Sequence, residues 1–187
     1  MKPLFTVHAG EYLVGAHIEK HYRRWSVWMP SKDTGIDLLV TGHGNSRTVS
    51  LQVKFSKDFT PHATEAGANL LQNKLVSMGW FTHQPAKLKK SVADFWVFVL
   101  PSFTDRETNF VIIEPLDLLR RLAAIHGKRR ARIHSYFWVT KTRRCWEARG
   151  LSSTDHGHIG LDTFSHKERD FTAFLNAWDP LEDRLGS

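Results

Sequence analysis

The sequence predicts an α/β fold in which helices flank a mixed central β-sheet. Residues 48–55 alternate between apolar and polar side chains, as expected for a strand with one buried face. Residues 94–101 and 109–113 are nearly continuous apolar runs, which are typical of strands buried on both faces. Helical segments precede and follow these strands, so the expected order is helix, three strands, helix, two strands, helix.

Each element has its own local pattern. The expected strands lie at 24–30, 35–40, 48–55, 94–101, 109–113, 135–139 and 145–148. The expected helices cover 10–22, 64–78, a segment that opens at Glu114-Pro115, and 167–178. For the helix at 64–78 the apolar stripe consists of Leu70, Leu71, Leu75 and Met78, and Gly79 is expected to end it.

The strand at 48–55 carries the side chains of chemical interest. Gln52 and Lys54 are two residues apart, so they share the face opposite the apolar one. The preceding strand opens at Asp37, and the loop 42–46 connects the two strands as a hairpin. Asp37, Gln52 and Lys54 are therefore expected to converge at one point of the sheet.

This combination suits metal-assisted hydrolysis of a phosphodiester. Mg²⁺ prefers oxygen ligands and is usually held by one or two carboxylates together with waters and substrate phosphates. We expect Asp37 to be the main ligand, with the Gln52 side-chain carbonyl and the Val53 backbone carbonyl beside it. Lys54 would orient the attacking water or offset the charge that develops on the phosphate. Mg²⁺ is the expected cofactor, and Mn²⁺ could replace it.

Asp37 followed by Gln52-Val53-Lys54 resembles the catalytic signature of the PD-(D/E)XK nuclease superfamily, in a QxK variant. Gln52 replaces the usual second acid, and Ile36 replaces the proline before the aspartate. The resemblance implies that Glu11, on the first helix, completes the metal site. It also implies a restriction-endonuclease-like fold, cleavage of DNA in restriction, defence or repair, and a possible homodimer.

Each of these residues also has a simpler interpretation. Asp37 could belong to a turn after Gly35, and Gln52 and Lys54 could form the solvated face of an edge strand. Glu11 could be an ordinary acid in the first turn of a helix. The alternative function is a catalytically inactive nucleic-acid-binding protein on the same fold.

Charge and aromatic residues predict a polyanionic partner. The formal net charge is +7, and basic runs flank aromatic strands in the second half of the chain. DNA is the expected partner, and the composition does not exclude RNA. The candidate phosphate-binding residues are Lys87, Lys89, Lys90, Lys128, Arg129, Arg130, Arg132, Lys141, Arg143 and Arg144.

The 187 residues predict a single domain, with a nuclease-like core at about 8–125 and a basic, aromatic extension at about 126–187. No apolar run reaches the length of a membrane span, and a cytoplasmic location is expected because Cys145 is the only cysteine. His156 and His158 could bind zinc, although a His-rich loop is the favoured interpretation. Cys145 has no visible His–acid partners for nucleophilic catalysis.

Overall fold

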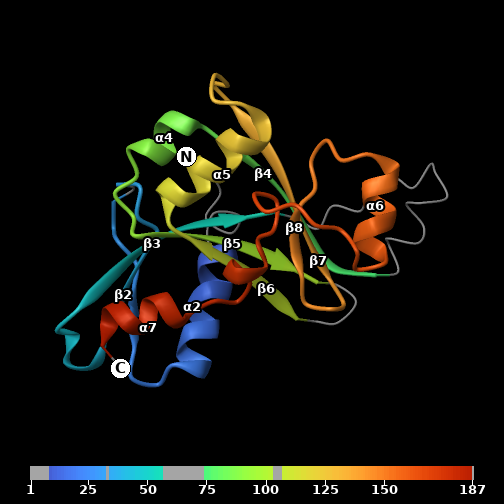
Figure 1. The fold of residues 1–187 in the computed structure, drawn as a ribbon. Coiled ribbons are helices and arrows are strands. Elements are labelled where there is room, and N and C mark those ends of the chain that lie inside the picture. Colours follow the sequence, from blue (N-terminus) through green and yellow to red (C-terminus); the bar gives the residue numbers. More distant parts are fainter. Residues whose placement is uncertain (1–8, 33, 57–73, 103–106, 187) are drawn as a thin grey trace.

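A computed structural model describes residues 9–32, 34–56, 74–102 and 107–186. Two sheets form the architecture (Figure 1). The larger sheet has the order β1-β2-β3-β5-β6 and the smaller one the order β4-β7-β8. Their strands are β1 (Ser26–Trp28), β2 (Leu38–Thr41), β3 (Thr48–Phe55), β4 (Leu75–His83), β5 (Phe95–Pro101), β6 (Thr108–Ile113), β7 (Ile133–Thr140) and β8 (Cys145–Glu147).

Helices lie against both sheets. The α-helices are α2 (Ala9–His21), α4 (Pro85–Lys89), α5 (Pro115–His126), α6 (Ser153–Gly160) and α7 (Asp179–Leu185), and the 3-10 helices are η1 (His43–Asn45) and η2 (Thr172–Phe174). The prediction of an α/β fold with a mixed sheet flanked by helices is therefore confirmed. No helix among these described segments is long and apolar enough to cross a bilayer.

β3 is the central strand of the larger sheet. It pairs with β2 in antiparallel fashion and with β5 in parallel fashion. The ladder with β2 ends at the pair Leu38 and Leu51, whereas the ladder with β5 continues to Phe55. On the side of β2, residues 52–55 of β3 therefore have no neighbouring strand. We call this place, where β2 ends beside β3, the step, and the candidate site residues lie there.

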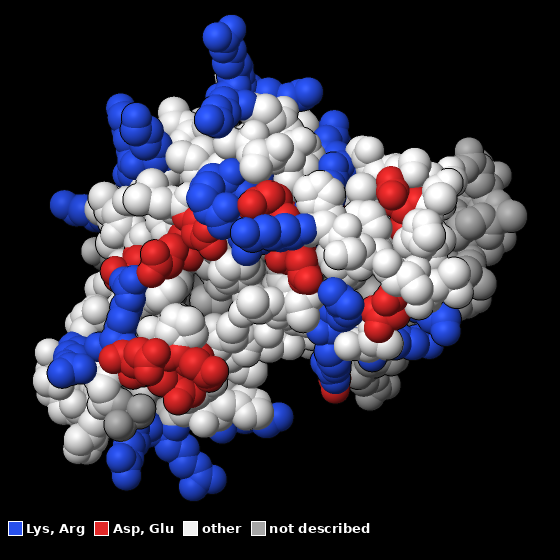
Figure 2. Space-filling view, in the orientation of Figure 1, with Lys and Arg blue, Asp and Glu red and all other residues white. Residues whose placement is uncertain are grey.

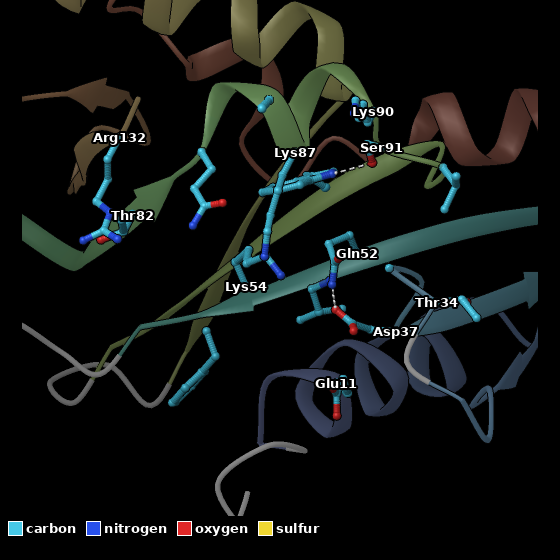
Figure 3. Close-up of a pocket in the computed structure, with 17 residues that line it drawn as sticks. Glu11, Thr34, Asp37, Gln52, Lys54, Thr82, Lys87, Lys90, Ser91 and Arg132 are labelled. Carbon is cyan, nitrogen blue, oxygen red and sulfur yellow. Dashed lines mark hydrogen bonds between the residues drawn. The ribbon is translucent and has the colours of Figure 1, made fainter. Parts of the chain in front are cut away.

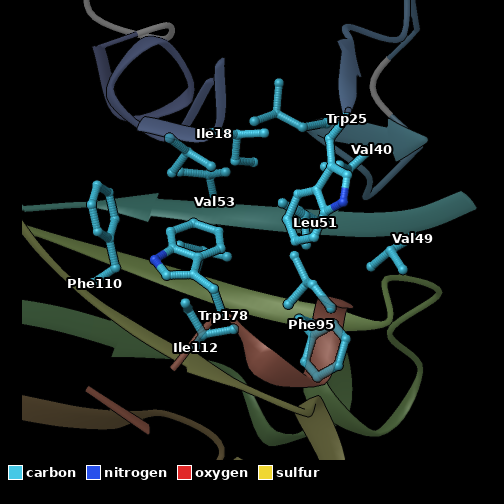
Figure 4. Packing of buried hydrophobic residues seen from close by; sticks show 14 of the residues in the cluster. Ile18, Trp25, Val40, Val49, Leu51, Val53, Phe95, Phe110, Ile112 and Trp178 are labelled. Carbon is cyan, nitrogen blue, oxygen red and sulfur yellow. The ribbon is translucent and has the colours of Figure 1, made fainter. Parts of the chain in front are cut away.

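The larger sheet has a hydrophobic core on each face. On one face, α2 and α7 pack over β3 and its neighbours, and Ile18, Leu51 and Trp178 belong to one core cluster (Figure 4). On the other face lie α4, α5 and the smaller sheet, with Phe98 against Phe137 at 5.2 Å between ring centroids. The alternating apolar side chains of β3 face the first core, as the sequence predicts.

The predicted helix over 64–78 is wrong from Leu75 onward, where β4 begins; residues 64–73 fall outside the described residues. Leu75 and Met78 fit a helical stripe, but the side chains of β4 alternate between two faces. Gly79 does not end a helix. It lies within β4, where an added Cβ would be 2.3 Å from Leu100 Cδ2 and 2.7 Å from Phe81 Cε2, so a larger residue would force these side chains to move.

The terminal helix predicted over 167–178 is also wrong. Asn176 has a positive φ of 51°, which ends helical geometry, and its backbone N–H donates to Phe110 of β6. The segment therefore pairs with β6, where Leu175 forms a bridge with Val111, and α7 starts only at Asp179. The predicted His-rich loop is helical instead, because the Ser152 hydroxyl and the Asp155 carboxylate cap α6 reciprocally.

Candidate active site

A pocket of about 1050 Å³ opens at the step between β2 and β3 (Figure 3). All five residues predicted for catalysis or metal binding line it: Glu11, Asp37, Gln52, Val53 and Lys54. They come from α2, the residue before β2, and β3. The structure therefore brings together residues that are up to 43 positions apart in the sequence.

Asp37 connects the two strands of the hairpin. Its backbone N–H donates to the carbonyl of Leu51 at 2.8 Å. Its Oδ2 accepts the backbone N–H of Val53 at 2.6 Å and also accepts the Gln52 side-chain amide. The carboxylate therefore binds β3 in the place where a further residue of β2 would pair.

The position of the Val53 carbonyl follows from this contact. In an antiparallel pair, one residue exchanges both its N–H and its C=O with the facing strand, so both groups point to the same side. Because the N–H of Val53 points toward Asp37, its carbonyl points toward the same side of β3, beyond the end of β2. This orientation agrees with the predicted ligand role.

Glu11 reaches the pocket because α2 approaches β3 closely. A Cβ at Gly10 would lie 2.8 Å from the Cβ of Phe55 and 3.1 Å from Val53 Cγ1. Glycine at this position therefore lets the first turn of α2 rest directly on β3. The neighbouring Glu11 is held at the edge of the pocket as a result (Figure 3).

Trp96 supports Lys54. The Lys54 ammonium lies 5.1 Å from the centroid of the Trp96 ring, a cation–π distance. The indole Nε1 donates to Ser91 Oγ at 2.9 Å, which fixes the ring on β5. A buried aromatic side chain thus positions the lysine in the pocket.

The donor set suits Mg²⁺. It comprises the carboxylates of Asp37 and Glu11, the Gln52 amide and the Val53 carbonyl. Asp37 and Gln52 are in direct contact, so both could face one cation. Gln52 could offer its oxygen by turning its amide. Among the described residues, no three His, Cys, Asp or Glu side chains form a metal-binding group, whereas Mg²⁺ needs only one or two carboxylates.

Three of the ten candidate phosphate-binding residues line this pocket: Lys87, Lys90 and Arg132. Lysine and arginine side chains project around α4 and from the segment after α5, whereas acidic side chains gather at α7 (Figure 2). Cations and candidate metal ligands therefore share one opening in the surface.

The other candidates lie elsewhere. Lys89, Lys128, Arg129 and Arg130 are exposed and are absent from the pocket lining. Arg143 pairs with Glu107 at 2.9 Å, Arg144 pairs with Asp170 at 3.2 Å, and Lys141 lines a separate pocket of about 280 Å³. Their contacts with nucleic acid stay predictions.

Several pocket residues lack a catalytic pattern in the sequence: Thr34, Thr82, Gln84, Ser91 and Trp96. Ser91 follows the basic run at Lys87–Lys90 directly, so its position beside the candidate phosphate-binding residues could have been inferred. Thr82 and Trp96 arrive through the packing of β4 and β5, which no local pattern shows.

Comparisons of this chain with protein-family models, curated proteins and solved structures found no match.

The alternative chemical sites do not assemble among the described residues. His156 packs against Trp138, whereas His158 forms a hydrogen bond with Thr163. Both histidines lie on α6, where residues two positions apart point in directions that differ by about 200°, so they do not face one metal ion. Cys145 is fully buried, and this burial, with a smaller effect of Asp170, raises the pKa of its thiol. A protonated, enclosed thiol is a poor nucleophile.

Proposed function

We propose that this protein is a Mg²⁺-dependent endonuclease that hydrolyses DNA phosphodiester bonds, on a restriction-endonuclease-like fold of the PD-(D/E)XK type. One observation carries the proposal: candidate metal ligands, Lys54 and the cations Lys87, Lys90 and Arg132 line the same pocket. The step between β2 and β3 supports it, because there the Asp and QxK elements meet.

Each side chain then has a defined task. Asp37, Gln52 and Glu11 would hold the cation, which would polarise the phosphate and lower the pKa of a bound water. Lys54, held against Trp96, would stabilise the charge that builds on the phosphate. Lys87, Lys90 and Arg132 would bind flanking phosphates and fix the register of the strand.

The test is cleavage of supercoiled plasmid and labelled oligonucleotides with Mg²⁺ or Mn²⁺, and with EDTA as the metal-free control. Asp37→Asn and Lys54→Met keep the shape of each side chain and remove its charge. Each is expected to lower the cleavage rate about 100-fold or more. Lys167→Met, an exposed lysine outside the pocket lining and outside the basic candidates, is the matched control and should retain activity. Cleavage that survives Asp37→Asn would contradict the proposal.

The Gln52 contact favours one second candidate, an inactive binding protein on the same fold. The side-chain amide of Gln52 donates a hydrogen bond to the Asp37 carboxylate, so this carboxylate has a partner even when no cation is bound. This candidate predicts DNA binding without cleavage, equal in the wild type and in Asp37→Asn. A cytoplasmic location, a homodimer and a role in restriction, defence or repair stay predictions from the resemblance.

A further inference from the structure

The outer face of the smaller sheet carries one exposed and two partly exposed aromatic side chains next to the pocket. Across β4 and β7, three residue pairs share this face: Met78 with Trp138, Trp80 with Tyr136, and Thr82 with His134. The cluster that contains Ile159 of α6 covers the first pair. At the second pair, the Trp80 side chain is 44% exposed, whereas tryptophan side chains in folded proteins are on average largely buried.

Three rings cluster on this face, which we call the aromatic face: Trp80, His134 and Tyr136. The planes of His134 and Tyr136 are inclined to that of Trp80 by 46° and 80°. The Trp80 ring lies 5.7 Å from His134 and 6.2 Å from Tyr136. Thr82 Oγ1 contacts His134 Nδ1 at 3.0 Å, which fixes the imidazole. These contacts hold the three rings in place on two paired strands, with Trp80 the most exposed of them.

Arginine side chains lie beside the aromatic face, and the neighbouring carboxylate of Glu147 is buried. The Arg149 guanidinium lies 5.4 Å from the Tyr136 centroid and donates to its hydroxyl at 3.2 Å. Slight burial and the charges of Arg149 and Arg132 lower the pKa of His134, so its ring is a neutral aromatic near pH 7. Aromatic surface combined with arginine is the usual recognition surface for unpaired nucleobases.

The aromatic face is continuous with the candidate active site. Thr82 and Arg132 line the pocket, and they lie at the side opposite Asp37 (Figure 3). Trp80 is anchored at the end of β3, where its backbone N–H donates to Ser56 Oγ at 2.9 Å. A strand that crosses the pocket from Asp37 past Lys54 would reach the aromatic face at Arg132.

We propose that the aromatic face stacks the unpaired bases of a single-stranded polynucleotide whose backbone enters the pocket. The proposal rests on the proposed function for the fate of that backbone. Bases in a duplex cover their flat faces with each other, whereas a single strand leaves them free to stack on the exposed ring of Trp80. Arg132 and Arg149 would bind the phosphates between stacked bases. The protein should therefore prefer single-stranded or branched substrates over intact duplex.

The test uses fluorescence anisotropy in EDTA, so that no substrate is cut. The probes are a labelled oligothymidylate of about 12 nucleotides, an abasic strand of equal length, the matching duplex and oligouridylate. Wild-type protein should bind the oligothymidylate at least about fivefold more tightly than the abasic strand, because stacking requires bases. Trp80→Ala should remove this difference, and Trp80→Phe should keep most of it.

Trp28→Ala is the matched control, since Trp28 is also an exposed tryptophan, at 52%. It lies on β1, an edge strand of the larger sheet, whereas the aromatic face is on the smaller sheet. It should keep the difference between base-containing and abasic strands. Because that difference is measured within each variant, a partial folding defect does not mimic the result. Equal binding of both strands by the wild type would overturn the proposal, as would tighter binding of duplex.

The two proposals fail separately. If Trp80→Ala binds as the wild type does while cleavage still requires Asp37, the aromatic face is not the base-binding surface and the nuclease function stands. If no substrate is cut but Trp80→Ala loses base-dependent binding, the nuclease function is wrong and the aromatic face stands. The oligouridylate arm shows whether the same face also accepts RNA.

Discussion

The contact between Asp37 and Gln52 shows how a neutral residue can replace an acid in a candidate metal site. Two carboxylates at hydrogen-bond distance repel each other, and one of them must gain a proton or a cation. The Gln52 amide donates to Asp37 Oδ2 instead, so the pair is stable without a cation. This arrangement should bind a cation less tightly than two acids would.

Gln52→Glu tests this exchange. Without a divalent ion at pH 8, the new carboxylate should destabilise the fold by about 1–3 kcal/mol, because it replaces a hydrogen bond with repulsion. Addition of Mg²⁺ should then raise the melting temperature more in this variant than in the wild type. Thermal unfolding with and without Mg²⁺ measures both effects.

Gln84→Glu is the matched control for that experiment, since Gln84 lines the same pocket at the start of α4. It makes the identical chemical change away from Asp37. An equal response to Mg²⁺ in both variants would show that pocket charge, rather than the pairing with Asp37, determines cation binding.

At the scale of elements, the approach of α2 to β3 depends on one glycine. Gly10→Ala would place a methyl group 2.8 Å from the Phe55 Cβ, so α2 must move outward and take Glu11 with it. We expect a loss of about 1–3 kcal/mol in unfolding free energy and reduced cleavage. Urea unfolding and the plasmid assay measure these two effects.

Gly15→Ala in the same helix provides the comparison. Its added methyl group would meet only Val27, at an ordinary 3.8 Å. Alanine should stabilise α2 by about 0.5–1 kcal/mol and leave cleavage unchanged. If both alanine variants behave alike, the close approach at Gly10 does not position the site.

β4 contributes a pH-dependent term to stability. His83 is buried, with Nε2 at 2.7 Å from Ser135 Oγ, and burial, followed by the charge of Lys54, lowers its pKa to about 3. The unfolded chain binds this proton near the ordinary pKa of 6.5, so the folded state loses stability as the pH falls below that value. The loss should reach about 2 kcal/mol at pH 5.

The measurement is urea unfolding of the wild type and of His83→Gln at pH 7.5 and pH 5. Whatever its stability at pH 7.5, the variant should lose about 2 kcal/mol less unfolding free energy than the wild type between pH 7.5 and pH 5. The same pH dependence in both proteins would assign the effect to other groups.

Local sequence patterns predicted those elements in which apolar residues recur at one regular spacing, either that of a strand or that of a helix. β3 alternates between Val49, Leu51 and Val53 on one face and polar residues on the other, and this pattern survives folding. The helix prediction is wrong at residues 75–78 because Leu75 and Met78 satisfy a helical spacing, whereas pairing with β7 makes this part of the chain a strand. At Asn176, a bond to Phe110 decides the conformation, and no neighbouring residue encodes that bond.

At the scale of the molecule, the charge distribution matters more than the net charge of +7. The hairpin of β2 and β3 placed Asp37 beside Gln52 through contacts between sequence neighbours, so that part of the site was predictable. Lys87 and Arg132 join it only because the smaller sheet packs against the larger one. Charge composition predicted a polyanion but could not rank the ten basic candidates.

Salt dependence can rank them. If Lys87 and Lys90 bind phosphates, the double variant Lys87→Ala, Lys90→Ala should reduce the slope of log affinity against log salt by about 1–2. The matched double variant Lys141→Ala, Arg143→Ala removes the same charge outside the active-site pocket and should leave the slope nearly unchanged. The reverse ranking would place the nucleic acid on the other basic region.

The end of β2 at Leu38 also creates an internal spectroscopic reporter. The Val53 amide proton is held by a carboxylate rather than by a neighbouring strand, so its NMR chemical shift and hydrogen-exchange rate depend on what else that carboxylate binds. A proton or a cation that engages Asp37 would weaken this bond and speed exchange at a single backbone position. Titration followed at Val53 would thus report occupancy of the pocket without any substrate, label or turnover.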